Sequence, residues 1–310
     1  MRRHVGWAVG VAAAATLLGV AGGARADEPL FGYVYTTDLL PKGKAEVEQW
    51  VTDREGQAHG HYHDFEASTE VEYGLTNNIQ VSFYTNYTYI DAKNNSVLGL
   101  TEGNDIKASH NPYHTYSDTH LDGFSSEVIW RVLSPYKDPI GLAFYVEPEW
   151  GAKEYGVELR AIAQKNFMDD RLVLAGNAWI EFEQEAGSNL GANGAEEGAD
   201  GAKAAATYLE YDLGASYRFI PNWSFGLEFR NHNEYDGYSI AHSKQDHTAF
   251  FLGPNIHYGG ERWFFTLSVL RQLGAIGYTD DQKAQLYHGL LYGDEHTTWD
   301  GIRLRVGRTF

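Results

Sequence analysis

The amino-acid sequence predicts an all-β fold, a closed antiparallel transmembrane β-barrel of about twelve strands. Three observations lead to this prediction. The last nine residues alternate between apolar and charged side chains, the N-terminus carries an export signal, and alternating segments joined by short turns and long loops fill the rest of the chain. Alternation with a period of two is typical of a strand whose two faces meet different surroundings.

The C-terminal segment, residues 302–310, alternates most clearly. One face carries two arginines, and the apolar face carries Ile302, Leu304, Val306 and Phe310. A strand that runs to the last residue and ends in Phe resembles the terminal strand of bacterial outer-membrane β-barrels. In that group the terminal aromatic is part of the signal read by the barrel-insertion machinery. The resemblance therefore implies that these four apolar residues form a membrane insertion signal and that this machinery is a partner.

The N-terminus has the three parts of a secretory signal peptide. Residues 2–3 are arginines, residues 5–20 are almost uncharged, and residues 24–26 read Ala-Arg-Ala, a small-residue cleavage site. The apolar part is too short for a spanning helix, and no later run approaches the roughly 18 apolar residues that such a helix needs. We therefore expect residues 1–26 to be a signal peptide and the mature chain to lie in the lipid of a Gram-negative outer membrane.

The composition agrees with an exported barrel. The chain has no cysteine, so disulfide bonds do not hold the fold. The mean hydropathy of −0.42 is compatible with a membrane barrel, because only every second strand residue faces lipid. The formal net charge of −18 argues against a nucleic-acid partner, since there is no basic patch to neutralise phosphate. We expect no cofactor.

Twelve alternating segments run through residues 44–310, which we expect to form the barrel. They are residues 44–54, 64–75, 79–90, 121–133, 141–150, 157–164, 172–183, 207–219, 223–231, 248–258, 262–273 and 302–310. Short turns alternate with long polar connections, as expected when one barrel rim faces the periplasm and the other faces outside. Aromatic residues near strand ends fit interfacial girdles: Tyr73, Trp150, Trp223, Tyr258 and Trp263.

A soluble β-sandwich is the alternative fold, because its strands also alternate. A sandwich would not normally sort its connections by length, nor expose apolar faces such as Trp223, Phe225, Leu227 and Phe229 on many strands. Lipid offers no hydrogen-bond partners to the backbone, so a sheet that spans it must have no free edge. The barrel therefore accounts for more of the sequence.

If the apolar faces touch lipid, the opposite faces line a lumen. Glu46 or Glu48 faces inward on the first strand, and the other charged residues expected there are Glu66, Glu70, Glu72, Arg131, Glu147, Glu149, Glu158, Arg160, Glu181, Glu183, Glu210, Asp212, Arg218, Glu228, Arg230, Arg303 and Arg305. Twelve strands give a backbone diameter of roughly 24 Å. We expect a narrow, charge-lined channel for uptake of small polar or ionic solutes. Alternatively, opposing Arg and Glu side chains pair and fill the lumen.

Histidines gather in the long connections. His59, His61 and His63 lie in the first, and others lie in or beside later ones: His110, His114, His120, His232, His242, His247, His288 and His296. Imidazole suits Zn, Cu or Ni ions, so His59, His61 and His63 are candidate metal ligands, although their spacing matches no defined site. This gives a second hypothesis, a non-conducting barrel that binds a metal, a ligand or a partner protein through its outer loops.

A third hypothesis is a lipid-acting outer-membrane enzyme. Such chemistry needs a His within hydrogen-bond reach of a nucleophile, and His257 with Ser268 is a conceivable pair. Both would lie on the inward face, which lipid does not easily reach, and the chain has neither a G-x-S-x-G elbow nor a P-loop. We therefore predict that the protein is not an enzyme.

Residues 27–43 precede the barrel and are expected to form a short extra strand, a periplasmic tail, or a plug in the lumen. They contain Thr-Thr-Asp at 36–38 and Leu-Pro-Lys-Gly at 40–43, and a Glu-rich segment, Glu-Val-Glu-Gln-Trp, follows at 46–50. This series resembles the start of a family of small proteobacterial outer-membrane barrels, which includes transporter-like proteins of the phenol-degradation MetA type and uncharacterised members. The resemblance implies a barrel. A role with aromatic hydrocarbons would imply a more apolar lumen than the charged one expected here.

Overall fold

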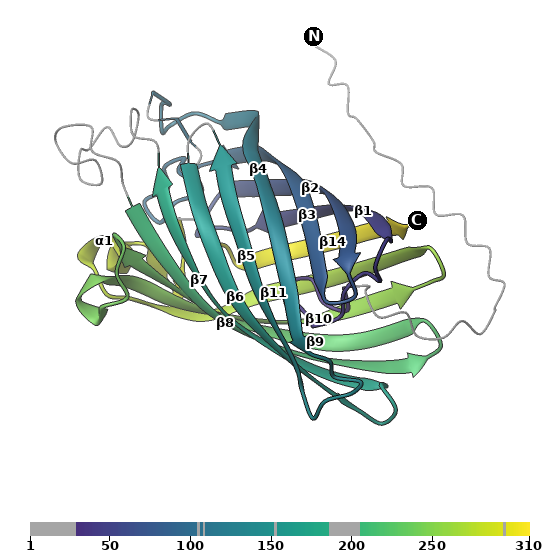
Figure 1. The fold of residues 1–310 in the computed structure, drawn as a ribbon. Coiled ribbons are helices and arrows are strands. Elements are labelled where there is room, and N and C mark those ends of the chain that lie inside the picture. The colour runs from purple at the N-terminus through teal and green to yellow at the C-terminus, as the bar shows by residue number, and fades with distance from the viewer. Residues whose placement is uncertain (1–28, 104–105, 108, 152–153, 186–204, 294–295) are drawn as a thin grey trace, which may run out of the picture.

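The computed structural model describes residues 29–103, 106–107, 109–151, 154–185, 205–293 and 296–310. In this part of the chain, twelve antiparallel strands close into a barrel (Figure 1). The expected signal peptide, residues 1–26, lies outside the described residues. No helix among the described residues is long and apolar enough to cross a membrane.

The barrel strands follow the chain in order. They are β1 (Ala45–Glu55), β2 (His61–Thr76), β3 (Ile79–Lys93), β4 (Tyr116–Leu133), β5 (Gly141–Gly151), β6 (Glu154–Phe167), β7 (Leu172–Glu185), β8 (Ala205–Ile220), β9 (Trp223–Asp236), β10 (Gln245–Gly259), β11 (Trp263–Gly277) and β14 (Trp299–Thr309). This result confirms the predicted fold class and strand number.

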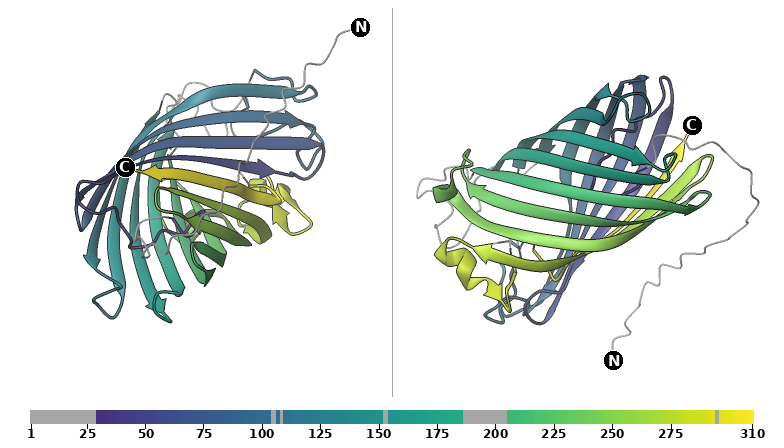
Figure 2. Two further views of the ribbon diagram at one scale, coloured as in Figure 1. Left: turned by 90° about the vertical axis from the view of Figure 1, so that its right-hand side faces the viewer. Right: turned by 90° about the horizontal axis from the view of Figure 1, so that it is seen from below.

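The ring closes between the first and last strands. Each strand from β1 to β11 pairs with the next, and β14 pairs with both β11 and β1. In the closing pair, Glu48 lies opposite Gly307 and Val51 lies opposite Leu304. Figure 2 shows β14 and β1 side by side in the wall. This pairing removes the two free edges that a membrane does not tolerate.

The two rims differ in their connections. The turn rim carries residues 77–78, 134–140, 168–171, 221–222 and 260–262, together with the start of β1 and the end of β14. The opposite loop rim carries the connections at 94–115, 237–244 and 278–298 and a shorter one at 56–60, and β5 ends and β6 begins at this rim only three residues apart. The connection at 56–60 and the step from β5 to β6 are shorter than predicted, because the flanking strands extend further toward the loop rim than their apolar alternation does.

Small elements occupy the connections of the loop rim. The 3-10 helix η1 (His242–Lys244) lies between β9 and β10. The connection between β11 and β14 contains helix α1 (Asp280–Ala284) and a hairpin of β12 (Leu286–Tyr287) and β13 (Leu290–Leu291). Thr279 caps α1 by accepting a hydrogen bond from the backbone N–H of Gln282.

Near the loop rim, the strands continue beyond the residues that show the apolar alternation. Strand β9, predicted to end at residue 231, continues to Asp236. The positions that continue its outward face are Asn231 and Asn233, which are polar. The apolar band therefore ends below the rim, while backbone pairing with β8 and β10 goes on. Hydrophobic alternation marks only the part of a strand that faces an apolar medium.

The outward faces are apolar and exposed, whereas polar side chains are buried on the inward faces. Leu213 and Leu227 are 61% and 49% exposed on the outside. The predicted insertion-signal residues of the last strand follow this pattern, because Leu304, Val306 and Phe310 are exposed and Ile302 is half-buried. An apolar exterior with a polar interior is the reverse of a soluble domain and is typical of a membrane barrel.

The apolar core lies inside the barrel and is divided into small clusters. Three of the four clusters each contain residues from the segment before β1: Leu39, Tyr33, and Phe31 with Val34. The fourth, at the loop rim, joins Tyr62, Ile90, Ala92 and Tyr116. The lumen is therefore occupied by chain that does not belong to the wall.

A charge placed in the outward apolar band should destabilise the barrel. We expect Leu227→Arg to lower the free energy of unfolding by about 2–4 kcal/mol, because Leu227 lies in the middle of the apolar part of β9. Ile276→Arg is the control, since Ile276 is 50% exposed but lies on β11 near the loop rim, where the cost should be about 0–1 kcal/mol. Urea titration in lipid vesicles measures both, and equal costs would contradict the placement of the band.

Candidate functional site

Residues 29–43, here called the plug, cross the lumen. From its start to its end the plug meets β11, β9, β7, β6 and β3 through the side chains of Thr266, Glu228, Asn177, Gln164 and Gln80. It leaves the lumen at the turn rim, where the N–H of Gly43 donates to the carbonyl of Gly74 at 2.8 Å. The segment thus passes across the barrel from one wall toward the other before β1 begins.

Glu228 of β9 makes the densest contact with the plug. Its carboxylate is fully buried and accepts hydrogen bonds from the backbone N–H groups of residues 32–34 at 2.9, 2.7 and 3.3 Å in chain order. The side chains of Asn255 and Ser268 donate to the same carboxylate at 2.8 and 2.5 Å. Hydrogen bonds to a carboxylate are roughly twice as strong as neutral ones, so this residue anchors the first half of the plug.

Amide side chains of the wall form hydrogen bonds with the backbone of the second half of the plug. Asn177 accepts from the N–H of Tyr35 at 2.7 Å and donates to its carbonyl at 2.9 Å. Gln164 accepts from the N–H of Thr37 at 2.7 Å, and Gln80 accepts from that of Leu40 at 2.8 Å. Buried backbone groups need hydrogen-bond partners. Side chains of the wall provide them for the plug, whereas in the barrel wall the backbone of a neighbouring strand provides them.

Arginines of the wall stack on the plug tyrosines. The guanidinium carbons of Arg303 and Arg230 lie 3.9 and 4.7 Å from the ring centre of Tyr33, and that of Arg160 lies 4.5 Å from Tyr35. Each distance lies within the range of a cation–π contact, which contributes more when it is shielded from water. Arg303 also donates to the carbonyl of Gly32 at 3.1 Å.

Two glycines of the wall leave room for plug side chains. A Cβ atom at Gly214 would lie 2.7 Å from the ring of Phe31, and one at Gly301 would lie 1.5 Å from the hydroxyl of Tyr33. Both approaches are shorter than real Cβ contacts, so any larger residue at these positions requires the plug to move. The wall is shaped for this segment.

Three arginines of the lumen are held in bidentate ion pairs. Arg160 binds Glu158 through two hydrogen bonds of 2.8 and 3.0 Å. Arg305 binds Glu48 in the same bidentate manner, with one bond of 3.0 Å. A third pair joins Arg230 to Glu210 at 2.6 and 2.8 Å, and Arg230 reaches Asp300 at 3.1 Å. Bidentate geometry fixes each arginine in a set direction.

The residues predicted to line the lumen lie on the inward faces. Buried among them are Glu70, Glu72, Glu158, Arg160, Glu210, Asp212, Glu228 and Arg230. Half-buried are Glu66, Arg131, Glu147, Glu149, Glu181, Glu183, Arg218, Arg303 and Arg305. Glu46 and Glu48 are both buried, so the first strand turns both carboxylates inward. Arg218 lies beside the turn rim, and Arg131 donates to the plug at the carbonyl of Thr37.

Sequence reasoning missed several groups that the structure brings to the lumen. Glu127 of β4 is 1% exposed and accepts from the hydroxyl of Tyr84 at 2.6 Å. It has the same parity as Arg131, so alternation along that strand was sufficient to find it. Asn177 and Gln164, whose side-chain amides hold the plug, carry no charge. Nothing in the sequence therefore distinguishes them from other polar residues of the strands.

One cavity of about 40 Å³ is lined by residues that include Tyr35, Glu70, Glu127 and Arg305. A space of this size holds only a few water molecules. This cavity beside the plug is therefore too small for an organic solute.

The structure does not bring the three predicted metal ligands to one centre. His61 faces Asp91 at 3.3 Å, while Nδ1 of His63 faces Asp53 at 3.0 Å. The ring of His59 lies against Tyr287 instead. Among the described residues, His63 shares a group of closely spaced ligand atoms only with the carboxylates of Asp53 and Glu55.

His257 and Ser268, the pair considered for lipid chemistry, form hydrogen bonds with different partners. Nδ1 of His257 lies 2.8 Å from the hydroxyl of Thr266, whereas the hydroxyl of Ser268 donates to Glu228. Both His257 and Ser268 are buried inside the barrel beneath the start of the plug. This arrangement holds the plug and its wall together and does not present a nucleophile to lipid.

Comparison with solved structures gives barrels of the same kind. The COG4313 outer membrane channel from Pseudomonas putida F1 matches 94% of this chain and 100% of its own, with a TM-score of 0.57 and 10% identity. The NanC porin covers 86% of this chain and 98% of its own (TM-score 0.46, 11% identity). The translocator domain of the autotransporter NalP from Neisseria meningitidis covers 88% and 90% (TM-score 0.48, 10% identity). At these identities, the likeness to the Pseudomonas channel shows the fold alone.

The sequence itself places the chain in a family. No curated protein matches it. The family described as "Family of unknown function (DUF6662)" matches residues 23–310, which include the plug and the whole barrel. The likeness to the Pseudomonas channel shows a closed β-barrel fold, and no finding extends to the phenol-degradation MetA type. The chain belongs to the DUF6662 family of unknown function.

Proposed function

We propose that this protein is an outer-membrane channel for uptake of small polar or ionic solutes, and that the plug is a removable constriction of its lumen. The observation that carries the proposal is the way the plug is held. The backbone N–H groups of residues 32–35, 37 and 40 donate to side chains of the wall and not to the backbone of a strand. A segment bound in this manner can leave without opening the barrel.

The proposal orients the chain in the membrane. Export would remove residues 1–26, so that the mature chain begins two residues before Pro29. The turn rim would then face the periplasm and the loop rim the outside, as is usual for barrels with both strand ends on one side. Residues 27–43, which include the plug, would form the segment before the barrel, and residues 44–310 would form the barrel.

The lumen walls support conduction of polar rather than apolar solutes. Without the plug, the carboxylate of Glu228 and the amides of Asn177 and Gln164 would turn to water or solute. The guanidinium groups of Arg160, Arg230 and Arg303 would lose their contacts with the plug tyrosines, Tyr35 and Tyr33. Such a lumen offers hydrogen-bond donors, acceptors and both signs of charge, which are the groups that select hydrophilic solutes in channels.

The competing function is a non-conducting barrel that binds a ligand, a metal or a partner at the loop rim. The plug and the ion pairs occupy part of the lumen and leave less room for a solute, which favours this alternative. Contacts of His257 and Ser268 give no support to a lipid-acting enzyme. Conduction therefore separates the two remaining candidates.

Removing the negative charge of Glu228 should loosen the plug. The chain lacks cysteine, so Val34→Cys introduces a single thiol at a plug position that is only 3% exposed. We expect Glu228→Gln to raise the rate of maleimide labelling of this thiol at least about tenfold, equivalent to about 1.4 kcal/mol of plug stability. Glu149→Gln removes a lumen carboxylate near the loop rim and should leave the rate unchanged. Equal rates in both variants would show that Glu228 does not hold the plug.

Filling a glycine of the wall should displace the same segment without changing any charge. In the Val34→Cys background, Gly301→Ala places a methyl group where the Tyr33 hydroxyl lies, so labelling should again accelerate. Gly274→Ala is the matched control, because the nearest atom to its added Cβ is 3.6 Å away. Retained slow labelling in Gly301→Ala would mean that Tyr33 does not fix the position of the plug.

Deletion of residues 29–40 tests conduction directly. In planar bilayers we expect the deletion variant to give single-channel steps several-fold larger than those of the intact mature chain, because the constriction is gone. Heat-dependent electrophoretic mobility checks that the variant barrel is folded. Equal steps would show that the plug does not constrict the lumen. A folded variant that never conducts would reject the channel in favour of the binding barrel.

A further inference from the structure

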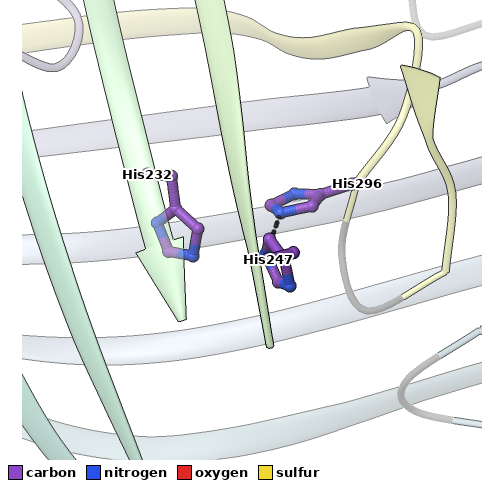
Figure 3. A group of neighbouring side chains, drawn as sticks. All are labelled: His232, His247 and His296. Atoms are coloured by element: carbon purple, nitrogen blue, oxygen red, sulfur yellow. Dashed lines mark hydrogen bonds between the residues drawn. The ribbon is translucent and has the colours of Figure 1, made fainter. Parts of the chain in front are cut away.

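Three histidines that lie far apart in the sequence meet inside the barrel near the loop rim. His232 belongs to β9, His247 to the start of β10, and His296 to the connection before β14. Figure 3 shows their rings turned toward one another, and one nitrogen from each ring lies within 4.8 Å of the other two. Nε2 of His247 and Nε2 of His296 are 2.8 Å apart.

Each of these rings has a carboxylate beside its other nitrogen. Nδ1 of His232 lies 2.9 Å from Glu210. Nδ1 of His247 is 3.7 Å from Glu234, and Nδ1 of His296 is 3.9 Å from Asp300. A carboxylate behind a ligating histidine fixes the tautomer and orientation of the ring, and such pairs are typical of metal sites in proteins.

Without an ion, the contact between His247 and His296 leaves a conflict. A neutral imidazole has one N–H, so the ring that donates through Nε2 must present a bare Nδ1 to its carboxylate. Nδ1 of both rings is buried and lacks a hydrogen bond. A cation between the two Nε2 atoms removes the conflict, because both Nδ1 atoms then carry protons toward their carboxylates.

The surroundings keep the site neutral enough for a cation. The nearby positive charge of Arg230 is already shared between Glu210 and Asp300. Arg54, the other cation near His296, is paired with Glu66. Two carboxylates, Glu210 and Asp300, thus lie among the ligands with one arginine between them.

We propose that His232, His247 and His296 form a binding site for a divalent transition-metal ion of the zinc, copper or nickel type. Nε2 of each ring would bind the ion, because Nδ1 of His232 is engaged by Glu210. Tetrahedral bonds of about 2.0–2.1 Å place ligand nitrogens roughly 3.3 Å apart, so the two close Nε2 atoms need to separate by only about 0.5 Å. Three histidines leave a fourth position for water.

The proposed ion would tie a loop to the barrel wall. His296 lies in the connection 278–298, which already contacts the wall through Gln272 of β11 and the connection 56–60 through Gln57. The two other ligands lie on neighbouring wall strands. Bound metal would therefore hold this connection inside the mouth of the barrel. The site exists whether or not the lumen conducts.

Metal titration of the detergent-solubilised mature chain, purified without a histidine tag and stripped with a chelator, tests the proposal. We expect one Zn²⁺, Cu²⁺ or Ni²⁺ per chain, with nitrogen hyperfine structure in the electron paramagnetic resonance spectrum of the Cu²⁺ form. His232→Gln, His247→Gln and His296→Gln should each weaken binding at least about 100-fold, measured by competition with a chromophoric chelator. Three separate variants guard against one that fails to fold, and electrophoretic mobility checks each barrel.

His61→Gln is the matched control, because His61 is an exposed histidine on the same rim. Its affinity should equal that of the unchanged chain. Two results would overturn the proposal: no stoichiometric binding by the unchanged chain, or binding that survives all three lumen substitutions. Loss of binding in His61→Gln alone would also overturn it and assign the metal to the surface loop.

Discussion

Closure of the sheet between β1 and β14 is the constraint on which the rest of the molecule depends. Once no strand edge is free, every second side chain must point into an enclosed space. That space is lined by carboxylates, arginines and amides whose hydrogen bonds have to be satisfied without bulk water on every side. The bidentate pairs of Arg160, Arg230 and Arg305 and the position of the plug are both solutions to this requirement.

The plug shows how an irregular segment can be buried among polar groups. Its backbone is satisfied by Glu228, Asn177, Gln164 and Gln80, and its aromatic rings cover arginines. Such contacts are specific in direction but individually modest, since each one replaces a hydrogen bond to water. Buried apolar side chains of the plug, among them Phe31, Val34 and Leu39, add packing against the wall.

Sequence reasoning recovered the wall better than its contents. Parity along each strand identified the inward charges. The same rule extends to Glu127, which lies on the same strand as Arg131 and has the same parity. The three histidines predicted as metal ligands do not converge on one centre. His61 and His63 lie on the same face of β2 with ring centres 4.9 Å apart, but they lie beside different carboxylates, Asp91 and Asp53, and the ring of His59 lies against Tyr287. The group that does converge combines single histidines from three parts of the chain, and no local pattern marks it.

The sequence by itself determined the export signal expected at the N-terminus, the closed barrel and the direction of most strand side chains. These depend on local patterns, because a period of two along the chain is sufficient to separate a lipid face from a polar face. Only the tertiary structure decided that residues 29–43 fill the lumen and that His232, His247 and His296 meet. Those contacts depend on strand register and on the return of loops into the barrel, which join residues with no fixed spacing in the sequence.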